Sequence, residues 1–231
     1  MTVSDRASAL QAYHEAEVLR CTRCPLHEGR TQVVAGSGDP EARLMFIGEA
    51  PGYHEDRMGV PFVGQAGKLL DRLLDEIGLT RGDVFVANVL KCRPPGNRDP
   101  LQSEIESCEP HLFRQVSIIR PVLICTLGNF ATKLISGRSD GISRVHGHEL
   151  PISVGGIDTL LYPLFHPAAA LHNPSLVAVL EEDFARIPVL LSRGAGTGDV
   201  GAALPGAVDA APGLQPTLTG AVSGTEQLGL F

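Results

Sequence analysis

Short apolar runs alternate with helical segments along most of this sequence. Residues 43–47, 84–90 and 122–127 are apolar runs of strand length, and the segment 65–77 places leucines and an isoleucine on one helical face. Further strands are expected within 144–164, around a Gly-Gly turn. Strands that alternate with helices form a mostly parallel sheet with helices on both faces. We therefore predict a three-layer α/β/α sandwich around a largely parallel four-stranded sheet.

The other helices are predicted from their start and stop signals. Residues 4–20 carry apolar side chains at helical spacing. Asp99 and Pro100 fit an N-cap followed by proline in the first turn, which predicts a helix from there to about Val116. Two more helices are expected over 129–136 and 175–192.

Ligands of such sheets bind outside the carboxyl ends of the strands. The loops that follow residues 43–47 and 84–90, and the loop that follows Phe165, are therefore where we expect chemistry.

The composition changes after Gly194. Residues 195–231 are rich in Ala, Gly, Pro and Thr and contain no Lys or Arg. Because such a segment buries too little apolar surface to fold, we predict a folded domain over 1–194 and a flexible linker over 195–226. No apolar run approaches the roughly 20 residues that cross a bilayer, and no secretory signal is visible. We expect a cytoplasmic monomer.

The net charge argues against nucleic acid as a partner. It is −7 for the whole chain, and Asp199, Asp209 and Glu226 account for −3 of it, which leaves −4 on residues 1–194. Phosphate contacts need a basic footprint, so any DNA-binding face must be local.

Four of the five cysteines form a pattern that suggests metal binding. Cys21 and Cys24 are a C-x-x-C pair, and Cys92 and Cys108 are single. Structural zinc commonly uses two such pairs, so one pair and two singles favour a [4Fe–4S] cluster. The alternative is that the singles are core cysteines and the pair is incidental. Cys125, inside an apolar run, is interpreted as a small buried hydrophobe.

Cys92 and Cys108 bracket a basic loop over 93–100. Metal ligation would fix both ends of this loop and hold Lys91, Arg93 and Arg98 as a ridge for phosphate contacts. The alternative is a solvated, arginine-containing turn.

Three blocks of sequence resemble the family-four uracil-DNA glycosylases. Gly48-Glu49-Ala50-Pro51-Gly52, with Glu55-Asp56 and residues 59–67, is similar to the first motif of that family. Residues 88–98 resemble the second block, and His166-Pro167-Ala168 resembles the last. The four cysteines fall where the family carries its cluster ligands, and the match covers about residues 15–193. The resemblance implies an enzyme that hydrolyses the N-glycosidic bond of uracil in DNA during base excision repair, releasing uracil and leaving an abasic site.

The resemblance also implies roles for residues of the three blocks. Phe62 would stack on the everted base, and the amide of Asn88 would read its Watson–Crick edge. His166 would donate to uracil O2 as the base leaves as an anion. Without the resemblance, Phe62 is equally a core aromatic and Asn88 a turn former.

Further site residues follow from the same motifs. Glu49 would either orient the attacking water or stabilise the sugar cation. Backbone amides around Ala50 and Gly52 would contact the base or water, and Glu55 would crowd the methyl group of thymine. Leu171 would fill the vacated base stack, or it is a core leucine.

Three other functions are alternatives. A sister branch of the superfamily stays covalently bound to DNA through a histidine, but residues 91–100 contain none, and Ala50 replaces a glutamine typical of that branch. An electron carrier would leave Glu49, Asn88 and His166 unexplained. A zinc-stapled, non-catalytic DNA-binding module is the third alternative.

The chain ends in Gln227-Leu228-Gly229-Leu230-Phe231. This ending resembles the peptide by which bacterial repair proteins bind the sliding clamp, with Gln227, Leu228, Leu230 and Phe231 as contacts. The linker before it would supply reach, and the protein would act at the bacterial nucleoid. The alternative is a chance apolar terminus.

Overall fold

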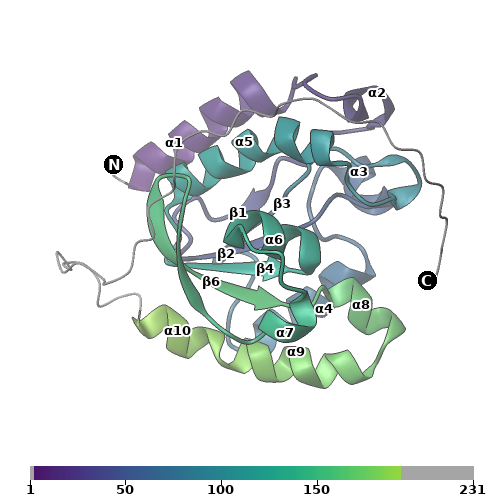
Figure 1. Cartoon of the computed structure of the whole chain (residues 1–231). Helices are drawn as coiled ribbons and strands as arrows, with labels where there is room; N and C mark the ends of the chain where they lie inside the picture. Colours follow the sequence, from purple (N-terminus) through teal and green to yellow (C-terminus); the bar gives the residue numbers. More distant parts are fainter. Residues whose placement is uncertain (1–2, 194–231) are drawn as a thin grey trace, which may run out of the picture. The chain divides into compact units, whose positions relative to one another are not determined.

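The computed structural model describes residues 3–193, and its centre is a six-stranded sheet with the order β1-β3-β2-β4-β6-β5 (Figure 1). The strands are β1 (Ser37–Gly38), β2 (Leu44–Gly48), β3 (Val84–Asn88), β4 (Leu123–Leu127), β5 (Leu150–Val154) and β6 (Ile157–Leu164). The four inner strands are parallel, and β1 and β5 pair antiparallel at the edges. The predicted α/β class and largely parallel sheet are confirmed, but the two edge strands bring the sheet to six strands instead of four.

The helices form a layer on each face of this sheet (Figure 1). In chain order they are α1 (Val3–Tyr13), the π-helix η1 (His14–Val18), α2 (Leu26–Gly29), α3 (Tyr53–Met58), α4 (Gln65–Glu76), the 3-10 helix η2 (Pro95–Asn97), α5 (Gln102–Ile119), α6 (Asn129–Ser136), α7 (Ile142–Val145), α8 (Pro167–His172), α9 (Ser175–Ala185) and α10 (Ile187–Arg193). Within these residues, no helix is long and apolar enough to cross a membrane.

Alternating side chains of the inner strands supply two separate cores. On β2, Met45 and Ile47 pack with Leu112 of α5, whereas Leu44 and Phe46 pack on the opposite face with leucines of α4 and with α9. Every residue of β2, β3 and β4 is buried, as is typical of parallel strands covered on both faces. The three-layer arrangement is therefore built into the alternation of side chains along each strand.

The predicted start of α5 is wrong. The helix begins at Gln102, and Leu101, not Asp99, is the capping residue. The Leu101 amide donates to Oε2 of Glu104 at 2.9 Å, and the Arg98 guanidinium donates to both oxygens of that carboxylate at 2.9 and 2.6 Å. Glu104 therefore sets the start of the helix from inside its first turn.

The C-terminal helical segment also differs from the prediction. One helix was expected over 175–192, but α9 ends at Ala185 and α10 begins at Ile187. Pro188 lies in the first turn of α10, where a missing N–H costs least, and it cannot continue the hydrogen bonds of the preceding helix.

Candidate active site

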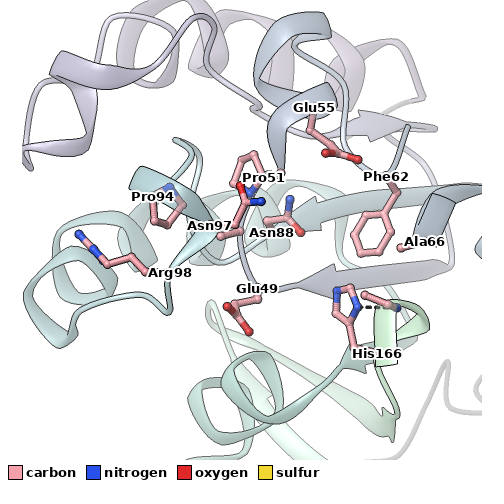
Figure 2. Close-up of a pocket in the computed structure, with 13 residues that line it drawn as sticks. Glu49, Pro51, Glu55, Phe62, Ala66, Asn88, Pro94, Asn97, Arg98 and His166 are labelled. Carbon is pink, nitrogen blue, oxygen red and sulfur yellow. Dashed lines mark hydrogen bonds between the residues drawn. The ribbon is translucent and has the colours of Figure 1, made fainter. Parts of the chain in front are cut away.

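A cavity of about 350 Å³ opens at the carboxyl ends of β2, β3 and β6 (Figure 2). It is lined by Glu49, Ala50, Pro51, Gly52, Glu55, Phe62, Ala66, Asn88, Pro94, Asn97, Arg98, His166 and Ala168. The structure thus brings together the residues that the three sequence blocks singled out. Ala66, Pro94 and Asn97 also line the cavity, and they lie inside the blocks without having been assigned a role.

Asn88 is the last residue of β3 and forms part of the cavity wall. Its side chain is 2% exposed, and its Oδ1 atom is buried without a hydrogen-bond partner in the described chain. A buried, unpaired acceptor typically costs about 1–3 kcal/mol, a cost that a ligand N–H group would remove. The cavity therefore has a preformed acceptor on its wall.

Gly48 lies opposite Asn88 in the parallel register of β2 and β3. A Cβ atom on Gly48 would lie 2.5 Å from Asn88 Oδ1 and 2.7 Å from Cζ of Phe62. The glycine therefore leaves the space in which these two side chains reach their positions. Sequence reasoning assigned it no role, although a glycine at the end of a buried strand is a signal of close approach.

Phe62 has a left-handed backbone conformation, with φ of 55°, which a non-glycine residue rarely adopts. Its ring stacks on that of His166, with centroids 5.5 Å apart and planes inclined by 24°. Arg81 Nη2 donates to the Phe62 carbonyl at 2.9 Å, and a Cβ on Gly67 would lie 1.7 Å from that oxygen. Arg81 and Gly67 thus hold and accommodate this strained residue, and neither was singled out from the sequence.

His166 is the N-cap residue of α8 and lies two residues past the end of β6. Its Nδ1 accepts from the Ala168 amide at 3.0 Å (dashed in Figure 2), which leaves Nε2 to carry the proton of a neutral ring. Burial lowers the pKa of His166 to about 4, so the imidazole is neutral at pH 7. The side chain can therefore donate one hydrogen bond from Nε2.

Two carboxyl groups line the same cavity. Burial, and to a lesser extent the charge of Asp99, raise the pKa of Glu49 to about 7. Oε1 of Glu55 accepts from the amides of Val63 and Gly64, each at 3.0 Å. Glu55 thus anchors the loop that carries Phe62 as well as lining the cavity, whereas Glu49 is poised to change its charge near neutral pH.

The family comparison agrees with this geometry. The model of the uracil DNA glycosylase superfamily matches residues 35–187. The chain belongs to this superfamily. It is 49% identical over 181 residues to the type-4 uracil-DNA glycosylase of Saccharolobus solfataricus, which covers 76% of this chain and 84% of that protein. It is 45% identical to the type-4 uracil-DNA glycosylase of Archaeoglobus fulgidus over 181 residues, which cover 77% of this chain and 91% of that protein.

Similarity to another branch of the superfamily is more limited. The type-5 uracil-DNA glycosylase of Thermus thermophilus is 40% identical over 89 residues, which is 32% of this chain and 40% of that protein. The resemblance to family four inferred from the sequence blocks is therefore confirmed.

Four residues were predicted to contact DNA, and the structure places their side chains in three kinds of position. Arg98 lines the cavity and pairs with Glu104, and Arg93 is half-buried beside it. Leu171 is 48% exposed on α8 but does not line the cavity. Lys91 is 2% exposed, so its predicted phosphate contact is wrong.

Lys91 points inward because buried acceptors surround its ammonium group. Nζ donates to the backbone oxygen of Asn88 at 2.8 Å and to Oε1 of Gln115 at 2.7 Å. Burial lowers the pKa of Lys91 to about 8. The side chain therefore ties Asn88 to α5 rather than contacting solvent.

The four predicted metal ligands, Cys21, Cys24, Cys92 and Cys108, line one small cavity. Three of their sulfurs have a neighbouring hydrogen-bonding nitrogen: His111 Nε2 at 3.2 Å from Cys21, Arg30 Nη1 at 3.4 Å from Cys92, and the Lys91 amide at 3.3 Å from Cys108. Cys125 is fully buried in β4, as expected.

Four cysteine sulfurs on one cavity are a donor set that a [4Fe–4S] cluster can use. Within the described residues, no three His, Cys, Asp or Glu side chains are grouped closely enough to hold a metal ion. Zinc would need all four sulfurs at about 2.3 Å from one point. In a four-iron cluster each thiolate binds a different iron, so sulfurs spread around one cavity are the expected arrangement.

Proposed function

We propose that this chain is a type-4 uracil-DNA glycosylase that hydrolyses the N-glycosidic bond of uracil in DNA. It releases free uracil and leaves an abasic site with the phosphate backbone intact. The single observation that carries the proposal is the buried, unpartnered Oδ1 of Asn88, on the wall of a cavity that also holds the stacked rings of Phe62 and His166. The similarity to type-4 glycosylases over three quarters of the chain supports it.

Asn88 selects uracil by hydrogen bonding. Its unpaired Oδ1 accepts from uracil N3–H, and its amide nitrogen donates to O4. Cytosine presents an acceptor at N3 and an amino donor at position 4, so both contacts become mismatched. The everted base stacks on Phe62, which offsets part of the cost of leaving the duplex.

His166 assists the departure of the base. Cleavage places negative charge on the uracil, and the Nε2–H of the neutral imidazole donates to O2. One preorganised donor of this kind is typically worth about 3–4 kcal/mol of transition-state stabilisation. Because the ring is already neutral and fixed by Ala168, no proton has to move before the bond breaks.

Glu49 acts on the sugar side of the reaction. Its carboxylate orients the attacking water or stabilises the positive charge that develops on the sugar, and both roles require the ionised form. Glu55, with the loop it anchors, forms the wall that excludes the methyl group of thymine. Backbone amides near Ala50 and Gly52 complete the wall.

A [4Fe–4S] cluster held by Cys21, Cys24, Cys92 and Cys108 is part of the proposal. The group supplies a rigid cross-link between chain segments, and no redox step is needed for hydrolysis. Arg30 Nη1, His111 Nε2 and the backbone amide of Lys91 each lie within hydrogen-bond distance of one cysteine sulfur, and ligation would fix the loop over 93–100 at both ends.

A glycosylase assay on duplexes that contain one uracil tests the proposal. The wild-type protein should release free uracil and leave an alkali-labile site, and Asn88→Ala and His166→Ala should each lose at least about 100-fold in rate. His148→Ala is the matched control, because His148 is exposed and does not line the cavity. A protein–DNA adduct that survives denaturant would indicate covalent trapping. If the wild-type protein released no uracil and left no alkali-labile site, the proposal would be contradicted.

The C-terminal residues 227–231 are proposed to bind a second partner, the bacterial sliding clamp. Residues 227–231 lie outside the residues that the structure describes, so their proposed binding to the bacterial sliding clamp, at the nucleoid, rests on their sequence alone. Deletion of these five residues should abolish clamp binding and leave excision from short oligonucleotides unchanged. Unchanged clamp affinity, measured by surface plasmon resonance, would refute this part of the proposal.

A further inference from the structure

An exposed tyrosine lies at the edge of the cavity, between its two rims. Tyr53 begins α3 and is flanked in sequence by Gly52 and, two residues later, Glu55, both of which line the cavity. Its ring also contacts Arg93, the residue before Pro94 on the opposite rim. Tyr53 therefore connects the loop after β2 with the loop after β3.

Two guanidinium groups flank this ring. The Cζ atoms of Arg93 and Arg57 lie 5.2 and 5.8 Å from its centroid, within the ~6 Å range of cation–π attraction. Arg57 Nη1 also donates to the Tyr53 hydroxyl at 3.3 Å, and Arg93 Nε donates to Asn97 Oδ1 at 2.7 Å. We call Tyr53, Arg57 and Arg93 the Tyr53 cluster. Its contacts fix where both cations lie relative to the cavity.

The Tyr53 cluster carries two positive charges that form no ion pair with a described carboxylate. Within residues 3–193, neither Arg57 nor Arg93 forms an ion pair, whereas the neighbouring Arg98 is committed to Glu104. Tyr53 is 49% exposed, although a large apolar ring gains by burial. In a chain with a net charge of −7, two unpaired guanidiniums beside an active-site cavity mark a local anion-binding surface.

We propose that the Tyr53 cluster binds the DNA backbone next to the everted nucleotide. This inference rests on the proposed function, because the cavity must hold the extrahelical base. Arg57 and Arg93 each bind a phosphate, and the Tyr53 ring keeps the two guanidiniums at a fixed separation and covers the adjacent sugar. Planar guanidiniums suit phosphate because they can donate two parallel hydrogen bonds. The cluster thus supplies the local basic footprint that the overall charge lacks.

Salt dependence provides the test of the phosphate contacts. Arg57→Gln and Arg93→Gln should each raise KM for a one-uracil duplex by roughly tenfold and leave the rate at saturating DNA within about twofold. The logarithm of the DNA-binding constant decreases linearly with the logarithm of the salt concentration, and the steepness of this line should decrease by about 0.9 for each lost phosphate contact. Arg72→Gln is the control, because it removes the same charge from an arginine that pairs with Glu181 on another helix. It should leave the slope unchanged.

Substitutions of the ring separate ordered cations from simple charge. Tyr53→Leu keeps both arginines and the net charge, yet it should raise KM about fivefold, and Tyr53→Phe should restore most of the affinity. Melting temperatures of all variants establish that they are folded. If the arginine variants release uracil with the wild-type KM and salt slope, the inference fails while the proposed function stands. A wild-type protein that releases no uracil would instead contradict the proposed function, and its DNA binding would still report the salt slope.

Discussion

At the scale of single residues, the cavity depends on atoms that are absent as much as on atoms that are present. Gly48 faces Asn88 across two neighbouring parallel strands, and its missing side chain leaves room for Asn88 Oδ1 and for the Phe62 ring. The positions of the Asn88 and Phe62 side chains therefore depend on a residue that has no side chain of its own.

Gly48→Ala should reduce kcat/KM by about 100-fold, because the new methyl group would displace the two side chains by roughly 1 Å. The fold should survive, since Gly48 ends its strand. Steady-state kinetics with a one-uracil duplex measures the effect. Gly82→Ala is the control, because its Cβ would come no closer than 3.5 Å to another residue. Wild-type kinetics for Gly48→Ala would show that the close approach is unimportant.

Two groups of the cavity with shifted pKa values, Glu49 and His166, predict the pH profile. The pKa of Glu49 is raised to about 7 by burial, and that of His166 is lowered to about 4 by burial. Activity should rise as pH increases through about 7, as Glu49 ionises, while His166 stays neutral throughout this range. A kcat/KM profile from pH 5 to 9 measures this rise. The Glu49→Gln variant should have a low kcat/KM that does not rise with pH. If the rise persisted in this variant, it would have to come from another titratable group.

The same shift has a consequence for stability. Glu49 ionises near pH 4.5 in the unfolded chain but near 7 in the folded protein, so the folded state loses stability as pH rises from 4.5 to 7. Because Glu49 is only partly buried, the full penalty above pH 7 is about 1–2 kcal/mol. Glu49→Gln should therefore raise the melting temperature at pH 8 and leave it unchanged at pH 4. Equal shifts at both pH values would contradict this assignment.

At the scale of elements, the spacing of apolar residues predicted the helices and strands that local interactions determine. The inner strands and the helices over 65–77 and 129–136 follow from apolar spacing, and the strand-end loops converge as the topology requires. Side-chain contacts that override the local pattern were not predictable. The inward turn of Lys91 depends on Gln115 of α5, and the start of α5 depends on the pairing of Glu104 with Arg98.

The conformation of Phe62 is another property that its own sequence does not explain. Its φ of 55° is stabilised from 19 positions away by Arg81, whose Nη2 donates to the Phe62 carbonyl and, at 3.3 Å, to that of Gly67. Arg81 also pairs with Asp71. Arg81 is thus a positioning residue for the Phe62 ring.

Arg81→Gln should lower kcat about tenfold with little change in KM for DNA, because the ring contributes after the base has everted. Arg81→Lys should recover part of the rate by donating one of the two hydrogen bonds. Asp71→Asn is the matched control: it removes the ion pair but keeps both donors to the loop, and it should retain the wild-type kcat. Single-turnover rates distinguish these outcomes, and equal losses in Arg81→Gln and Asp71→Asn would indicate a merely structural role.

At the scale of the whole molecule, the four clustered cysteines join three distant parts of the chain. Cys21 and Cys24 follow the N-terminal helical segment, Cys92 follows β3 and Cys108 lies in α5. Lys91 links this site to the cavity, because its amide donates to Cys108 Sγ and its ammonium donates to the Asn88 carbonyl. A change at the cysteines should therefore reach Asn88 through one residue, Lys91.

Removal of iron by oxidation and chelation should test this connection. If the proposed cluster is present, the protein should be brown before treatment and colourless after it, and its melting temperature should fall, because three segments lose their cross-link. Trypsin should then cut faster after Arg98, because the bond after Arg93 leads into Pro94 and resists trypsin. Excision should decline with the freed loop, while circular dichroism reports a retained sheet. Cys108→Ser should reproduce these effects, whereas Cys125→Ala, which replaces a cysteine buried elsewhere in β4, should keep iron and activity. If Cys108→Ser bound as much iron as Cys125→Ala, the assignment of the four ligands would be wrong, and Lys91 would have no metal site to couple to Asn88.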